Sequence, residues 1–254
     1  MSSLLLGVIQ SSGGGGVERS YSITGVNTDV VLLDMHTALY GAPVSGDHTT
    51  FTVEVGATVR SSGPSVPSMD TGTWPAGSSW SVVNLEFTRW RGAGADGTGP
   101  SAGGRGGTAF KARTAGTLNN TLGALRGGGG AGAGTDIWTN GLGQTYKAGG
   151  GGGAGDRPGL GFVVTGSDNN QSGHDGTTTL RGLGGHFGSD PSQPTSPHVQ
   201  GGDGGNQGSD GTSASDVYLT GSTDNTGGPA GYAIDGYSLV TLVGTGTLIG
   251  PVNG

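Results

Sequence analysis

The stretch GGDGGNQGSDG occupies residues 201–211 and places Gly202, Gly205, Gly208 and Gly211 three residues apart. Three residues per turn is the geometry of an extended polyproline-II-type helix, which has no internal hydrogen bonds. When such a helix is buried, its backbone groups must find partners on neighbouring segments. Because glycine has no Cβ, neighbouring backbones can approach closely. The stretch therefore predicts a polyglycine-II bundle, with every third residue pointing inward and the Asp, Asn, Gln and Ser residues between facing water.

Glycine accounts for 60 of the 254 residues and proline for 11. A chain of this composition without periodicity is usually disordered, and collagen would need an unbroken three-residue repeat. A single glycine tract cannot be stable, because ordering a glycine costs about 0.5–1 kcal/mol more than ordering an alanine, and a hydrogen bond returns about 0.5–1.5 kcal/mol net. Several tracts must therefore pack together. The tracts are residues 92–107, 127–134, 148–155, 182–188, 201–211 and 227–231.

Residues 1–91 are richer in β-branched and aromatic residues, in alternating stretches such as YSITGV (21–26), TDVVLLD (28–34) and TTFTVEVGATV (49–59). This pattern predicts a β-rich attachment or base domain. No window of twelve residues has helical periodicity free of Gly or Pro, so almost no α-helix is expected. The predicted fold class is all-β with polyglycine-II helices. The second domain is expected to span residues 92–254 and to close with a C-terminal β-hairpin.

Three apolar, strand-like runs that end in glycine lie at 81–92, 116–127 and 237–250. They are expected to stack as strands and to form a small β base that brings the ends of the glycine tracts together. The N-terminal LLLGVI run (4–9) is too short for a signal peptide or a membrane span and is expected to be an edge or docking strand.

If the base holds the runs at 81–92 and 116–127, the tract between them must leave the base and return. The same alternation then predicts the position of each later segment. Residues 98–101 form an outer turn, 127–134 run outward, 135–147 form a distal loop, 148–155 return, 156–181 lie at the base, and 189–200 are distal again.

Aromatic residues of the glycine-rich half fall in the inserts between tracts. Loops on a rigid scaffold carry recognition residues, and aromatic side chains supply contact area at low entropic cost. The inserts predicted to be distal therefore supply the candidate binding residues. These candidates are Trp138, Asn140, Tyr146, Phe187, Asp190 and His198.

Several chemistries are not expected. GAGADG (92–97) matches the dinucleotide fingerprint, but no helix can follow it to hold a pyrophosphate. The five histidines lack the spacing of a zinc site, no acid–base pair is indicated, and the net charge of −7 does not favour nucleic acid or anionic membranes. No catalytic residue, metal, cofactor, nucleic-acid partner or membrane insertion is predicted, and with no Cys the fold must hold without disulfides.

Two stretches resemble a known family. VGATVRSSGPSVPSMDTGTWPAGSSWSVVNLEFTRWRGAGADG (55–97) and GGPAGYAIDGYSLVTLVGTGTLIGPV (227–252) are similar to the glycine-rich C-terminal tips of tailed-phage tail-fibre and tail-tip host-specificity proteins. TGTWPAGS is the most specific element. The architecture also resembles the distal adhesins of T-even-type long tail fibres. Here, however, the glycine tracts are shorter than usual, and residues 1–50 have no clear counterpart.

The resemblance implies a virion tail protein that binds a host outer-membrane protein or surface glycan through loops between polyglycine-II helices. It also implies other tail proteins as partners, with the chain acting as a homotrimer or as a cap on a trimeric fibre. Three alternatives stay open: a structural glycine-rich virion protein without receptor contact, an ice-binding glycine-rich protein, and a depolymerising tail spike. A depolymerase would need carboxylates about 5–10 Å apart in a groove.

Overall fold

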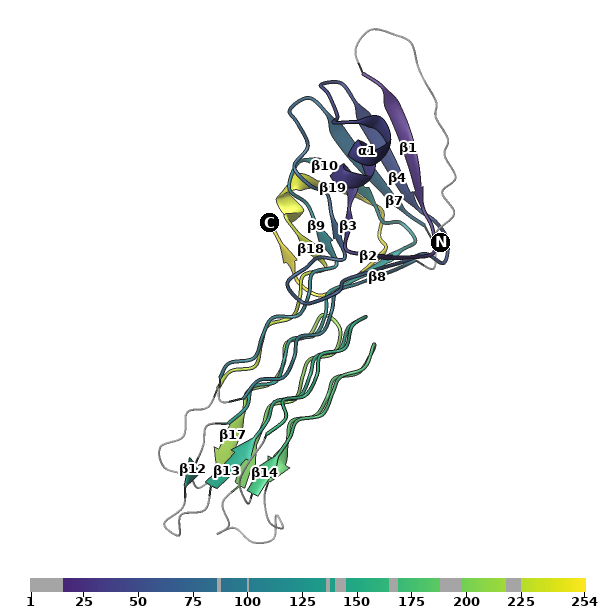
Figure 1. Ribbon diagram of the computed structural model, residues 1–254. Coiled ribbons are helices and arrows are strands. Elements are labelled where there is room, and N and C mark those ends of the chain that lie inside the picture. The colour runs from purple at the N-terminus through teal and green to yellow at the C-terminus, as the bar shows by residue number, and fades with distance from the viewer. Residues whose placement is uncertain are drawn as a thin grey trace.

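The computed structural model describes residues 16–85, 88–99, 101–135, 138–139, 145–164, 169–187, 198–217 and 225–254. Figure 1 shows two parts, a compact group of β-sheets and a long bundle of extended segments that projects from it. We call the first part the β-helix (residues 16–91, 108–126 and 232–254) and the second the glycine bundle (residues 92–107 and 127–231). The LLLGVI run lies outside the described residues.

The β-helix consists of three sheets, each of five parallel strands. The first sheet contains β1 (Glu18–Ile23), β4 (His48–Val53), β7 (Ser79–Asn84), β10 (Gly116–Asn119) and β19 (Val240–Val243). The second contains β2 (Val26–Thr28), β5 (Thr58–Arg60), β8 (Arg89–Arg91), β11 (Ala124–Arg126) and β20 (Thr247–Ile249). The third contains β3 (Val30–Val31), β6 (Met69–Asp70), β9 (Phe110–Lys111), β18 (Ile234–Asp235) and β21 (Val252–Asn253).

The chain visits the first, second and third sheets in turn and then repeats the circuit, which makes a three-sided parallel β-helix. Alternate residues of each strand point inward and stack on the same position of the next coil. Phe51 stacks on Val82, and Val82 on Leu118, all fully buried. Trp80 and Trp90 both pack against the ring of Phe110, with ring centroids 5.8 Å apart in each pair, so each of the three sheets contributes to one hydrophobic core.

One α-helix, α1 (Leu32–Tyr40), connects β3 to β4, where the alternating pattern at 28–34 predicted a strand. The strand ends at Val31, and the next nine residues contain no Gly or Pro before Gly41 ends the helix with φ 80°. A helix of nine residues is shorter than the twelve-residue window over which helical periodicity was expected. Its inner face buries His36, whose Nδ1 lies 2.9 Å from the Thr49 hydroxyl, so tertiary packing decides the helix.

The β-hairpin predicted for the C-terminus is wrong. β19 pairs with β10 and β20 pairs with β11, both in parallel, because successive strands of a coil belong to different sheets. The stacking predicted for the runs at 81–92, 116–127 and 237–250 is confirmed by these pairings and by those of β7 with β10 and β8 with β11. All three sheets contain strands from both sides of residue 91, which marks only where the chain first enters the glycine bundle.

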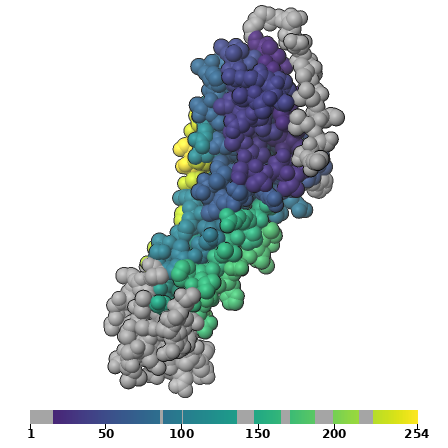
Figure 2. Space-filling model, viewed as in Figure 1, coloured from purple at the N-terminus to yellow at the C-terminus, as the bar shows by residue number. Residues whose placement is uncertain are grey.

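The glycine bundle is inserted into the β-helix at one corner. Residues 92–107 leave between β8 and β9, and residues 127–231 leave between β11 and β18, one coil further along. Both insertions therefore start from the second sheet and return to the third. Figure 2 shows the segments near residue 100 (blue to teal) and those near residue 175 (green) on opposite flanks of the bundle, below the sheets.

The segment 127–135 lies at the centre of the bundle and shows threefold hydrogen bonding along its length. Every third backbone N–H donates to the same neighbouring segment, as a helix of three residues per turn requires. Gly128 and Ala131 donate to Gly107 and Gly104, Gly129 and Gly132 to Ala154 and Gly151, and Gly130 and Ala133 to Ser209 and Thr212. Its carbonyl groups accept N–H groups from three further segments, 92–98, 201–205 and 226–231. This segment is therefore a polyglycine-II helix with six hydrogen-bonded neighbours.

The segment 148–155 is a second centre of the same kind. Its N–H groups donate to 92–98, 171–177 and 201–206, and its carbonyl groups accept from 127–135, 159–162 and 182–185. The two central segments bond to each other, and both are fully buried along their described length. They are also the segments closest to pure Gly and Ala, because six close neighbours leave no room for larger side chains.

The close approach requires glycine at particular central positions. A Cβ at Gly129 would lie 1.9 Å from the carbonyl oxygen of Gly205, and a Cβ at Gly132 would lie 1.9 Å from that of Gly202. These distances are far below van der Waals contact, and the atoms that would have to move are backbone. The polyglycine-II packing predicted from the sequence is therefore present, with glycine acting as the spacer.

The outer segments depart from the predicted orientation. In 201–206 two of every three residues are buried, and only the third, Asp203 or Asn206, points outward. The run that suggested the repeat also spans a turn, because Gly208 has φ +68° at the β-helix end and Gly211 belongs to the next segment. An outer helix of the bundle has neighbours on two of its three faces, so the repeat is two small residues and one polar residue.

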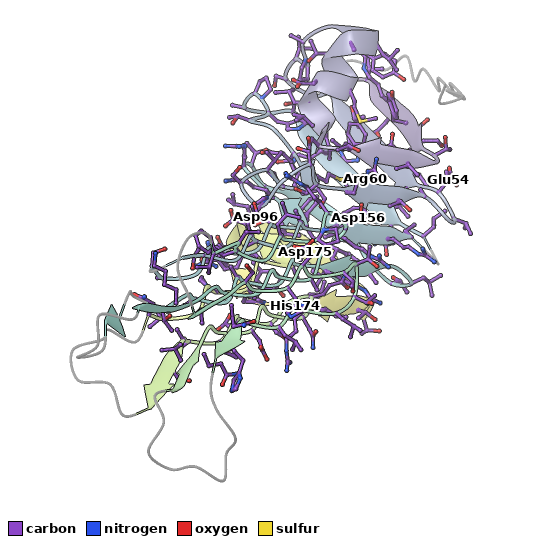
Figure 3. All side chains as sticks on the ribbon, turned by 60° about the horizontal axis from the view of Figure 1, so that its bottom comes forward. Glu54, Arg60, Asp96, Asp156, His174 and Asp175 are labelled. Atoms are coloured by element: carbon purple, nitrogen blue, oxygen red, sulfur yellow. The ribbon has the colours of Figure 1, made fainter. Side chains whose placement is uncertain are left out.

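The outward aspartates also do more than face water. Each accepts a hydrogen bond from a backbone N–H of an adjacent outer segment, where no further helix supplies a carbonyl group. The pairs are Asp96 with Leu160 (2.9 Å), Asp175 with Gly161 (2.7 Å), Asp203 with Gly184 (2.9 Å) and Asp210 with Ala230 (2.7 Å). Figure 3 labels Asp96 and Asp175 on the bundle. The carboxylates thus complete the hydrogen bonding at the edge of the bundle.

Candidate functional site

Two small sheets lie at the end of the glycine bundle far from the β-helix (Figure 1). One contains β12 (Trp138–Thr139), β13 (Thr145–Ala148) and β14 (Asn169–Gln171). The other contains β15 (His186–Phe187), β16 (His198–Gln200) and β17 (Ser215–Val217). We call this region the distal end. Every strand but β12 continues directly into a described, hydrogen-bonded bundle segment, so the bundle determines where those strands lie.

Four of the six candidate binding residues have their backbone in these sheets. Trp138 is the direct cross-strand partner of Tyr146, Phe187 is the partner of Val199, and His198 comes next along the same strand. β13 lies beside both β15 and β16, so the two sheets adjoin. The fold brings together, at one end, backbone positions as far apart in sequence as 138 and 198.

The remaining two candidates, Asn140 and Asp190, lie outside the described residues. So do the chain connections 140–144, 165–168, 188–197 and 218–224, each of which joins strands or segments that end at the distal end. The prediction that 135–147 and 189–200 belong to this end agrees with the position of the strands that flank them.

The prediction that residues 156–181 lie at the base is wrong. Of the described residues in this stretch, only those at its two ends lie near the β-helix. Asp156 lies 3.9 Å from Arg60, and the Thr178 carbonyl accepts from the side chain of Gln207, which in turn contacts Arg126. Between them the chain runs out through 159–164, forms β14 at the distal end and returns through 172–177. This stretch therefore adds one outward and one returning segment. Because the chain is back at the β-helix afterwards, the predicted direction of every later segment is unchanged.

Sequence reasoning missed β14 and β17 as parts of the distal end. The signal for β14 was weak, because its flanking segments contain short patterns, GLG at 159–161 and GHDG at 173–176, instead of a run of glycines. Outer segments need glycine only where a neighbour approaches. Gly161, for example, would place a Cβ 2.2 Å from the Gly173 carbonyl oxygen.

Among the described residues, the groups with shifted pKa values lie in the β-helix. Burial lowers the pKa of His36. The pKa of Asp47 is lowered as well, because the N–H groups of Val44 and Val17 and the charge of Arg19 outweigh the opposing effect of burial. In the part of the chain that the structure describes, no three His, Cys, Asp or Glu side chains group as a metal site would. No described helix is long and apolar enough to span a membrane.

A β-helix that projects a glycine bundle ending in small sheets is an elongated, fibre-like architecture, and the comparisons with known proteins specify the class. The family model described as "Phage tail fibre adhesin Gp38" matches residues 18–253, and the chain belongs to this family. It is therefore a bacteriophage tail fibre adhesin and belongs to the tail fibre of the virion. No curated protein matches the chain.

The fold is similar to that in the crystal structure of the gp37-gp38 adhesin tip complex of the bacteriophage S16 long tail fiber. The TM-score is 0.57 at 21% sequence identity, and the alignment covers 92% of this chain and 82% of the other. The predicted fold class, all-β with almost no α-helix, is confirmed, since the described residues are nearly all β and contain one α-helix.

Proposed function

We propose that the adhesin binds a host cell-surface receptor, an outer-membrane protein or a surface glycan, through its distal end. One observation carries this proposal: β12, β13, β15 and β16 lie together at one end of the bundle. The backbone groups in the interior of the bundle are hydrogen-bonded to neighbouring segments, so the frame that holds these strands is complete. Segments 135–147 and 189–200, with Trp138, Tyr146, Phe187 and His198, supply the contacts. The mechanism is non-covalent recognition, and several copies per virion convert modest affinity into avidity.

The bundle suits this role because its stability does not depend on what its connections contain. The central segments 127–135 and 148–155 bond to their neighbours mainly through backbone groups, with a few side-chain hydrogen bonds such as that from the Ala148 N–H to the Thr135 hydroxyl. The connecting sequences can therefore change, and with them the receptor, without loss of the frame.

We also propose that the chain caps a trimeric fibre and does not form a homotrimer. The last coil, β19 to β21, ends all three sheets with unpaired strand edges. It also exposes apolar residues, among them Val243 at 43% and Val252 at 45%. A three-sided end of this kind can continue the strands of three fibre chains. In Figure 1 it lies on the side of the β-helix opposite β1.

The receptor proposal is tested by replacing residues 140–144 and 188–197 with Gly-Ser sequences of equal length. The matched control replaces the turn 178–180, which lies at the β-helix end of the bundle. The distal variant should lose the ability to bind host cells and to block phage adsorption, whereas the control should keep both, with unchanged unfolding temperatures for the two. Full adsorption blocking by the distal variant would contradict the proposal.

The adsorption-blocking assay and a reducing-end assay distinguish the other roles. A structural virion protein without receptor contact would not block adsorption at all. A depolymerase would release reducing ends from host polysaccharide. Against that role, the described carboxylates Asp96, Asp175, Asp203 and Asp210 are bonded to backbone N–H groups of the bundle.

A further inference from the structure

Three arginines stand in register on adjacent strands of the second sheet. Arg60 on β5 pairs with Arg91 on β8, and Arg91 pairs with Arg126 on β11. The residues before them, Val59, Trp90 and Leu125, fill the core, so the three arginines lie on the outer face of the sheet. Neighbouring strands are about 4.8 Å apart, and like charges at this spacing repel each other. We call this set the arginine ladder.

The ladder faces the turns at the β-helix end of the glycine bundle. Asp156 Oδ2 lies 3.9 Å from Arg60 Nε, and Gln207 Oε1 lies 3.4 Å from Arg126 Nη1. Arg91 Nε is buried and has no hydrogen-bond partner. The contacts hold the bundle against the β-helix, but among the described residues they provide one carboxylate for three guanidinium groups.

The pKa of Arg91 indicates which charges surround the ladder. Burial lowers this pKa, Asp156 acts in the opposite direction, and the charges of Arg89 and Arg126 lower it further. Although the whole chain carries a net charge of −7, positive charge is therefore locally in excess here. An additional anion beside the ladder would reduce the repulsion between these positive charges.

A cavity of about 390 Å³ opens beside the ladder. Arg157 lies in its wall and donates from Nη1 to the Ser62 carbonyl oxygen at 2.8 Å, which orients its guanidinium group. Asp29 accepts the Ser62 N–H nearby. Figure 3 shows Arg60 and Asp156 at the junction of the sheets and the bundle. The residues that line the cavity include Thr28, Arg60, Ser61, Ser62, Asp156 and Arg157.

We propose that this cavity binds a phosphate group, held by Arg60 and Arg157. Guanidinium groups match the geometry of phosphate oxygens and bind them through paired hydrogen bonds. The hydroxyl groups of Thr28, Ser61 and Ser62 add polar contacts around the same space. The phosphate is either free inorganic phosphate or a phosphorylated sugar of a surface glycan. The site lies at the junction of the β-helix and the glycine bundle, away from the distal end, so it does not depend on receptor binding there.

The test is isothermal titration of the full chain with inorganic phosphate, mannose 6-phosphate and mannose at constant ionic strength. Saturable binding of phosphate at millimolar concentration or below is expected. Equal affinity for phosphate and mannose 6-phosphate would assign the site to free phosphate, and tighter binding of mannose 6-phosphate would assign it to a glycan. Absence of saturable binding, or equal binding of unphosphorylated mannose, would overturn the proposal.

Variants connect any binding to this cavity. R60Q and R157Q should each weaken phosphate binding by at least about tenfold, because each removes charge-assisted hydrogen bonds to the phosphate oxygens. The control R181Q changes an arginine of the glycine bundle that pairs with Asp203 at 3.3 Å, and should leave phosphate affinity unchanged. An equal loss of affinity in R181Q would overturn the assignment to this cavity.

A further variant separates binding from a purely structural role. D156N removes the carboxylate that competes with phosphate for Arg60, so phosphate affinity should rise, even though the contact between bundle and β-helix is weakened. Unfolding temperatures measured with and without phosphate check that the variant is folded. A fall in phosphate affinity in folded D156N would contradict the proposal.

Discussion

The backbone N–H of Gly132 donates to the carbonyl oxygen of Gly151 at 2.9 Å, which joins the two central segments of the glycine bundle. Neither residue has a side chain, and the contact depends on that absence. The bundle is a lattice of backbone groups in which neighbours in space are distant in sequence.

Substitution of a central glycine should therefore disrupt the bundle. G129A places a Cβ 1.9 Å from the Gly205 carbonyl oxygen, which only backbone movement can relieve, and we expect a loss of more than about 3 kcal/mol of stability or a bundle that does not form. The matched control is G104A, whose Cβ would meet only the Ala95 Cβ, at 3.7 Å. Thermal unfolding followed by circular dichroism measures both, and equal unfolding temperatures would contradict the lattice.

The aspartates at the bundle edge should act as substitutes for backbone carbonyl groups. D203A removes the acceptor for the Gly184 N–H and should lower the free energy of unfolding by about 1–2 kcal/mol. D203N keeps an oxygen at the same position and should lose only a few tenths of a kcal/mol, because the surface ion pair with Arg181 contributes little. Denaturant unfolding compares the two variants, and equal losses would show that charge matters more than the hydrogen bond.

The β-helix should lose stability in mild acid. The pKa of His36 in the folded protein is below its ordinary value of 6.5, so the unfolded chain binds the proton more readily. Stability is complete above that value and falls as the pH drops below about 6.5. Asp47, whose folded pKa is also lowered, adds a separate loss below pH 4. H36Q should reduce the slope of unfolding temperature between pH 7.5 and 5, and an unchanged slope would exclude His36 as its source.

Attachment to the fibre and receptor binding should be separable. V252D places a charge on the exposed edge strand β21 and should prevent incorporation of the adhesin into virions, while the purified variant still blocks adsorption. V55D, at an exposed position between β4 and β5 in the second coil, lies three coils from the last one, serves as the control and should be incorporated normally. Immunoblotting of purified virions gives the result. Normal incorporation of V252D would place the attachment surface elsewhere.

Much of the architecture could be read from local patterns. The alternation of YSITGV (21–26) predicted a strand, and the Gly and Ala content of 127–134 and 148–155 predicted close backbone packing. The positions of Trp138 and His198 at one end followed from the alternation of outward and returning segments. These inferences held because each depends on a property of single residues, either side-chain volume or preference for extended backbone.

Other features could not be predicted because they depend on partners far away in the chain. Whether 156–181 stays at the β-helix or makes an excursion is decided by hydrogen bonds such as Gly152 N–H to the His174 carbonyl, across 22 residues. The helix α1 forms because His36 is buried against Thr49 and Trp74. The role of Asp203 as an acceptor became visible only when Gly184 was placed beside it.

The sequence by itself determined that bare backbones would pack side by side, because a missing Cβ is a local property that no tertiary context changes. Only the tertiary structure decided which segments became neighbours, which segments occupy the centre, and that five coils of a β-helix hold their ends. Those outcomes arise from hydrogen bonds between backbone groups that are chemically alike in every tract. Local composition cannot distinguish such partners, and the connectivity of the whole chain selects among them.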